Sequence, residues 1–179
     1  MNFEAAGTGA EVPEILNPRG AEVIREAPES TSALLYLARA YSYNNELSKA
    51  EKPLKDILKK QADHIEGGQL LAQIYDRQKK YKELVNILKP LLEFRHDYPN
   101  YQLLARATYR LNKLKDSQKY YEEAVKLNDK NPQDYYNLGN IYLINLEYAK
   151  AAEAYNKAAS LKLDTPQLHY KLATVYFNL

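Results

Sequence analysis

The chain has 179 residues, of which 45% are hydrophobic and 27% are charged, and its formal net charge is +2. This length suits one domain, the composition excludes a disordered body, and so small a net charge gives no argument for nucleic-acid binding. The sequence contains no run of about 18 apolar residues, so we predict no membrane span. The absence of cysteine excludes disulfides and thiolate zinc sites.

The N-terminal region divides into a lead and a short helix. Residues 1–16 show no sustained periodicity and contain two glycines and a proline, so we predict a flexible lead. In residues 17–30, Asn17 can cap a helix that Pro28 ends, which predicts a capping helix packed on the segment after it. The lead lacks the layout of a signal peptide, which favours the cytoplasm; an exported or periplasmic chain remains an alternative, and the compartment stays unassigned.

From residue 31 onward, a leucine followed by a small residue recurs at steps of 34, 33, 34 and 34 residues. The five pairs are Leu37-Ala38, Leu71-Ala72, Leu104-Ala105, Leu138-Gly139 and Leu172-Ala173. Four residues after each leucine stands Tyr41, Tyr75, Thr108, Tyr142 or Tyr176. Because residues four apart share one face of a helix, each segment predicts an amphipathic helix.

A second set of markers follows in each full repeat, with spacings of three, four and three residues. In the fourth repeat these markers are Tyr148, Ala151, Tyr155 and Ala158. This spacing again marks one face of a helix, so each repeat is predicted to be a helix, a short turn and a second helix.

This period and pattern resemble the tetratricopeptide repeat (TPR) family. Residues 132–164 match the family pattern closely, with Tyr135 where the family most often has Trp. The resemblance implies an all-α fold, a right-handed α-solenoid of helix–turn–helix repeats over residues 31–179. About four full repeats (31–64, 65–97, 98–131 and 132–165) and a half repeat (166–179) are expected, together with the N-terminal capping helix.

The first two repeats depart from the family pattern. Pro53 and Pro90 fall inside second helices, where a proline removes a backbone donor, so kinks are predicted there. Gly67 and Gly68 stand at the start of the second repeat's first helix, at a cost of about 1 kcal/mol each relative to Ala, which predicts a frayed start.

No constellation of catalytic residues is evident. The histidines His64, His96 and His169 are not spaced as a helix-borne metal site requires, and no glycine-rich phosphate loop is present. We therefore predict a non-enzymatic protein with no cofactor and no metal.

In the resembling family, recurring first-helix positions line a concave groove and hold peptide ligands. Carried over to this sequence, the predicted groove residues are Arg39, Tyr43, Gln73, Arg77, Arg106, Tyr109, Arg110, Tyr136, Asn137, Asn140, Tyr170 and Lys171. The same positions also include Leu143 and Ile144. Arginine offers forked donors for carboxylates and tyrosine offers flat amphipathic area, so the predicted ligand is a segment carrying acidic and apolar residues. The alternative is that these are ordinary exposed residues and that the contact lies elsewhere.

These observations predict a protein-interaction scaffold that binds a peptide segment of another protein in its groove. A second hypothesis is a structural or self-assembling fragment of a longer repeat protein, because the apolar end "VYFNL" leaves an open face for self-association. A nucleic-acid-binding helical repeat is less favoured, because the first helices carry no recurrent polar pair that could read bases.

Overall fold

The computed structural model describes residues 3–4, 11–12 and 18–179. Apart from two strands of two residues each, every element of the described chain is a helix, which confirms the predicted all-α class of paired helices. Strands β1 (Phe3–Glu4) and β2 (Glu11–Val12) pair antiparallel. The rest of the predicted flexible lead, residues 1–16, lies outside the described residues, so that prediction stays untested.

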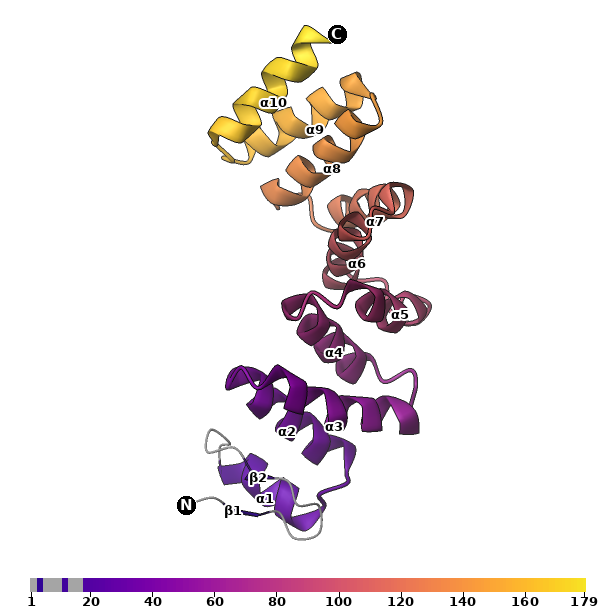
Figure 1. The fold of residues 1–179 in the computed structure, drawn as a ribbon, viewed down its shortest axis with the longest axis vertical. Coiled ribbons are helices and arrows are strands. Elements are labelled where there is room, and N and C mark those ends of the chain that lie inside the picture. Colours follow the sequence, from indigo (N-terminus) through magenta and orange to yellow (C-terminus); the bar gives the residue numbers. More distant parts are fainter. Residues whose placement is uncertain (1–2, 5–10, 13–17) are drawn as a thin grey trace. The chain divides into compact units, whose positions relative to one another are not determined.

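The chain divides into two compact units, Met1–Arg95 (unit 1) and His96–Leu179 (unit 2). In unit 1, the short helix α1 (Pro18–Glu26) precedes the first two repeats (Figure 1). Each repeat is a pair of helices: α2 (Thr31–Tyr43) with α3 (Leu47–Lys60), and α4 (Ile65–Arg77) with α5 (Tyr81–Leu91).

Unit 2 contains helices α6 to α10, which Figure 1 labels. Helix α6 (Tyr98–Arg110) packs on α7 (Leu114–Leu127), and α8 (Pro132–Ile144) packs on α9 (Tyr148–Ser160). Helix α10 (Pro166–Phe177) packs on α9. Pro99, Pro132 and Pro166 each lie in the first turn of a helix, where the missing N–H costs nothing.

The recurring leucines form the core of each helix pair. Leu71 and Leu104 are fully buried, Leu37 and Leu138 nearly so, and the small residues that follow them are buried as well. In the half repeat the pattern is weaker: Leu172 is half-buried and Tyr176 is 55% exposed, because α10 packs mainly on α9 and buries Leu168 and Val175 instead.

Close helix approach explains the glycine of the Leu138-Gly139 pair. A Cβ on Gly139 of α8 would lie 2.6 Å from a ring carbon of Tyr155 on α9, so only glycine fits at this packing distance. Gly68 of α4 plays the same part, since a Cβ there would overlap Leu91 of α5. The frayed start predicted for this helix is not observed: α4 is helical from Ile65, and His64 caps it by accepting from the Gly67 N–H at 3.0 Å.

Candidate functional site

In unit 2, the first helix of each repeat (α6, α8 and α10) contributes side chains to one pocket of about 320 Å³. Its described lining consists of Tyr109 from α6, four residues of α8, and Lys171 from α10; the α8 residues are Tyr136, Asn140, Leu143 and Ile144. The repeat positions named from the sequence thus bring Tyr109, Tyr136, Asn140 and Lys171 together. A second pocket of about 310 Å³ shares Tyr109 and Ile144 with the first and adds Arg110, Asn112 and Leu114. We call these two pockets together the unit 2 groove.

Contacts behind the groove fix the orientation of Asn140. The Tyr155 hydroxyl donates to Asn140 Oδ1 at 2.8 Å, so the amide nitrogen is the polar group that a ligand can use. Burial raises the pKa of the Tyr155 hydroxyl, which therefore stays protonated and remains the donor at neutral pH. The ring of Tyr136 packs against that of Tyr155, with centroids 5.8 Å apart, and is held in place by this contact.

The unit 2 groove combines apolar area with positive charge. Ile144 is 51% exposed and Tyr109 is 37% exposed, so both large side chains offer apolar surface to a ligand. Arg110 and Lys171 supply one cation to each pocket, and no carboxylate is among the described lining residues of either. The arrangement can therefore accept an apolar side chain flanked by a carboxylate, which a guanidinium binds with paired donors.

The other residues predicted for this unit do not line the groove. Asn137 donates to the Tyr121 hydroxyl at 2.9 Å and accepts from Gln133 at 3.0 Å, so its side chain is held within the fold. Arg106 is half-buried on α6 and lines neither pocket, and Tyr170 is 70% exposed on α10 outside both.

In unit 1 the predicted arginines contact their own fold. Arg39 of α2 forms an ion pair with Glu66 of α4. Arg77, the last residue of α4, donates to the Ser42 carbonyl and hydroxyl oxygens at 3.0 and 3.1 Å and to Asn45 Oδ1 at 2.8 Å. The guanidinium groups therefore tie the first helices of two consecutive repeats together.

Tyr43 and Gln73 complete the prediction for unit 1. Tyr43 is 77% exposed, and Gln73 lies exposed on α4. Neither side chain lines the unit 2 groove or the larger pocket that lies in unit 1.

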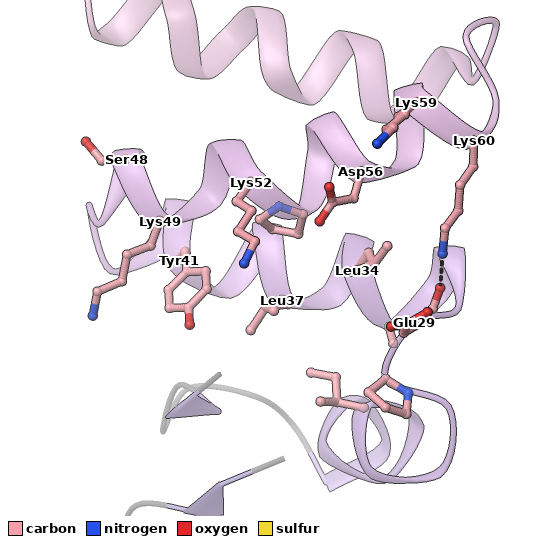
Figure 2. A pocket seen from close by; sticks show the side chains of 14 residues that line it. Glu29, Leu34, Leu37, Tyr41, Ser48, Lys49, Lys52, Asp56, Lys59 and Lys60 are labelled. Carbon is pink, nitrogen blue, oxygen red and sulfur yellow. Dashed lines mark hydrogen bonds between the residues drawn. The ribbon is translucent and has the colours of Figure 1, made fainter. Parts of the chain in front are cut away.

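That larger pocket, of about 840 Å³, lies between α1, α2 and α3 (Figure 2). Sequence reasoning missed it, because its lining comes from faces assigned to repeat packing. The one signal available was the lysine-rich α3 segment "LSKAEKPLKDILKK", which places several cations on a helix that was expected to be mainly structural.

The described part of the chain offers no candidate for a membrane span or for a metal site. There, no helix is both long and apolar enough to cross a membrane. Within the same residues, no cluster of three or more His, Cys, Asp or Glu side chains is placed to hold a metal ion.

The paired helices and the groove on their first helices define a helical-repeat protein. Two sequence models of the tetratricopeptide repeat family match it, one over residues 18–74 and the other over residues 103–177. The chain belongs to the tetratricopeptide repeat family.

Two curated relatives align with most of this chain. The chain is 27% identical over 164 residues to "DnaJ homolog subfamily C member 3 homolog" of Dictyostelium discoideum, covering 82% of this chain and 33% of that protein. It is 26% identical over 181 residues to human "Protein O-mannosyl-transferase TMTC1", covering 89% of this chain and 20% of that protein. The chain thus spans a third or less of these relatives.

Solved structures show the same fold at low sequence identity. The MamA protein superposes with a TM-score of 0.79 at 21% identity, covering 84% of this chain and 83% of that one. YrrB, described as a TPR protein with an unusual peptide-binding site, superposes with a TM-score of 0.81 at 17% identity, covering 88% of this chain and 82% of that one.

Proposed function

We propose that this chain is a non-catalytic interaction scaffold whose unit 2 groove binds a peptide segment of a partner protein. The observation that carries the proposal is the convergence of Tyr109, Tyr136 and Ile144 with two cations, Arg110 and Lys171, on adjoining pockets. The family is built to mediate protein interactions, and the similar fold of YrrB carries a peptide-binding site, which supports the same use here.

The chemistry of the groove specifies the peptide. An apolar side chain would pack on the tyrosines and Ile144, an acidic side chain would pair with Arg110 or Lys171, and the Asn140 amide would donate to a backbone carbonyl. No lining carboxylate of the described residues opposes an acidic ligand, whereas a basic peptide would meet two like charges.

Selection from a display library of short random peptides tests this proposal. Three proteins serve as targets: the parent, the groove variant Arg110→Glu/Lys171→Glu, and a control with the same charge change, Lys119→Glu/Lys130→Glu, whose residues are exposed outside both pockets. Peptides selected on the parent should contain an acidic and an apolar residue.

Such peptides should bind the control as they bind the parent and bind the groove variant roughly tenfold more weakly or worse, as expected for loss of close charge pairs. Equal affinity for all three proteins would refute the groove as the binding site.

One observation supports the self-association part of the second hypothesis. On and after α10, Phe177 is 90% exposed, Leu179 is 66% exposed and Tyr176 is 55% exposed. Association through this face would give a mass in solution that rises with concentration, and Phe177→Asp should abolish the rise.

A further inference from the structure

Helix α10 exposes a position that is buried on the first helices of the four preceding repeats. The small residue after the recurring leucine is fully buried in α2, α4 and α6, at Ala38, Ala72 and Ala105. Gly139, the matching residue of α8, is buried as well. On α10 the matching residue is Ala173, and it is exposed. A position at which two helices pack closely in each full repeat is therefore open to solvent on α10.

The tyrosine that follows this small residue shows the same difference. Tyr41 of α2 and Tyr75 of α4 are 7% and 4% exposed, whereas Tyr176 of α10 is 55% exposed. Asn156 of α9 donates to the Tyr176 hydroxyl at 2.7 Å, which holds the side chain in place and still leaves more than half of it exposed. Because Tyr176 and Ala173 are three residues apart, they lie on the same side of α10.

This exposed surface adjoins the contact between α9 and α10. Leu168 and Val175 of α10 are fully buried in the core cluster that α9 contributes to, and the half-buried Leu172 packs against the same cluster. Around the helix, Leu172 lies between Val175 and Tyr176, and Ala173 lies beyond Tyr176. We call Leu172, Ala173 and Tyr176 together the open face of α10. A helix docked there would extend an interface that already exists.

The first two repeats show what kind of element covers a face of this composition. Both have the leucine, alanine and tyrosine that α10 has at these positions, and in both the second helix of the repeat packs on the first. Each of these second helices, α3 and α5, buries an apolar row with spacings of four and three residues. The rows are Ala50, Leu54 and Ile57 on α3, and Leu84, Leu88 and Leu91 on α5. A helix with such a row therefore fits the open face of α10.

Electrostatic complementarity adds a second requirement. Where a second helix covers the recurring tyrosine, a lysine from the N-terminal end of that helix lies over the ring. The pairs are Lys49 with Tyr41, Lys80 with Tyr75 and Lys150 with Tyr142, at 5.7, 5.6 and 5.5 Å from the ammonium nitrogen to the ring centroid. A cation is attracted by the face of an aromatic ring. Tyr176 lies in the last turn of α10, where the helix dipole also favours a cation.

We propose that the open face of α10 binds a helix of a partner protein that has the pattern of this chain's second helices. Its N-terminal lysine lies over Tyr176, and its apolar row, with spacings of four and three residues, covers Leu172 and Ala173. The small side chain of Ala173 lets the two helices approach closely. Lys171 of the unit 2 groove stands two residues before Ala173 and thus on another side of α10, so the proposal does not depend on that groove.

A synthetic peptide taken from this chain tests the proposal. The probe is residues 78–93, which contain Lys80 and the apolar row of α5, capped at both ends and carrying Pro90→Ala to strengthen the isolated helix. One control peptide has the same composition scrambled so that the row is broken, and the other carries Lys80→Glu. Binding to the full chain is measured by fluorescence anisotropy. We expect both controls to bind more weakly than the probe, and equal binding of the scrambled peptide would overturn the proposal.

Three variants of the full chain locate the binding site. Ala173→Arg places a large cation on the open face, Gln167→Arg places the same cation at an exposed position on the opposite side of α10, and Arg110→Glu/Lys171→Glu alters the unit 2 groove. We expect Ala173→Arg to bind the probe roughly tenfold more weakly and the other two to bind as the parent does. Unchanged binding to Ala173→Arg, or a loss confined to the groove variant, would overturn the proposal.

Light scattering distinguishes a partner helix from a second copy of this chain. We expect the mass of the parent to stay constant as its concentration rises. A mass that rises in the parent but not in Ala173→Arg would assign the open face to self-association and overturn the proposal.

The orientation of the bound helix can be measured because the chain has no cysteine. Asn178→Cys provides a single thiol for a spin label two residues after Tyr176. Broadening of the probe's NMR signals should be strongest at its lysine end. Broadening that is strongest at the other end, or even along the probe, would contradict a lysine over Tyr176.

Discussion

Units 1 and 2 use the same repeat position in two different ways. Arg77 ends α4 and Arg110 ends α6, at matching points of consecutive repeats. In unit 1 the Arg77 guanidinium donates to Ser42 and Asn45 and holds the fold together. In unit 2 Arg110 lines a pocket with Tyr109 and Ile144. Under the proposed function, this repeat position can bind a ligand only where its donors are not already used by the neighbouring repeat.

Truncation of a buried core leucine should destabilise either unit, and this is the largest effect that we predict. Leu104 is fully buried, so Leu104→Ala should lower the free energy of unfolding by about 2–5 kcal/mol, from lost burial and the cavity left behind. Urea denaturation followed by circular dichroism measures the loss. Leu127→Ala, at a 50% exposed position of α7, serves as the control and should change it little. Equal melting of the parent and Leu104→Ala would refute the repeat register.

Gly139 of unit 2 and Gly67 of unit 1 should differ in their tolerance of a methyl group. Gly139→Ala would press a Cβ against the fully buried Tyr155 ring, at a cost of about 1–3 kcal/mol for overpacking. At Gly67 in unit 1 the nearest side-chain atoms, on His64 and Ile57, lie 3.1 and 3.2 Å away, so Gly67→Ala should destabilise less. Thermal unfolding of the two variants side by side compares them, and a larger loss for Gly67→Ala would contradict the packing described.

Low pH should lower the stability of unit 1 through Glu51, whose matching residue in α7 of unit 2 is not acidic. Glu51 of α3 is buried and hydrogen-bonded to Lys55 and Lys80, whereas the matching residue of α7 is the neutral Gln118. Burial alone would raise the pKa of Glu51, but the hydrogen bonds from the two lysines outweigh it and lower the pKa from 4.5 to about 2. A group with a lowered pKa stabilises the fold above pH 4.5, and this contribution is lost as the pH falls toward 2.

Glu51→Gln should therefore cost unit 1 about 1–2 kcal/mol at neutral pH, a modest figure because both lysine partners remain about half exposed. The loss should shrink toward about pH 3, where the parent carboxylate is itself becoming protonated. Native-state hydrogen exchange of α3–α5 measures it, with α7–α9 as the internal control. A loss that is the same at both pH values would mean that the carboxylate charge contributes nothing.

The matched arginines should separate stability from binding. Arg77→Ala removes hydrogen bonds to Ser42 and Asn45 and should cost about 1 kcal/mol of stability. Arg110→Ala, on an exposed residue, should leave the melting curve unchanged within experimental error. If Arg110→Ala destabilised as much as Arg77→Ala, the contrast drawn between the units would be wrong.

Periodicity was enough to predict the helix pairs, because the Leu37, Leu71, Leu104 and Leu138 positions need burial on one face whatever the partner residues are. It could not predict that Gly68 makes room for Leu91, since Leu91 belongs to another helix. Nor could it separate Arg77 from Arg110, because the difference lies in whether a preceding turn places Asn45 within reach. The larger pocket of unit 1 is lined by residues of α1, α2 and α3, and periodicity along the chain does not show that these residues meet.

The most direct test of the contrast between the units compares Arg77→Glu and Arg110→Glu in peptide binding. Both variants are first checked for a folded circular dichroism spectrum, and a peptide selected on the parent is then titrated against each. We expect Arg110→Glu to weaken peptide binding roughly tenfold, whereas the affinity of Arg77→Glu should stay within about twofold of that of the parent. An equal loss in both variants, or a greater loss in Arg77→Glu, would contradict the unit 2 groove as the binding site.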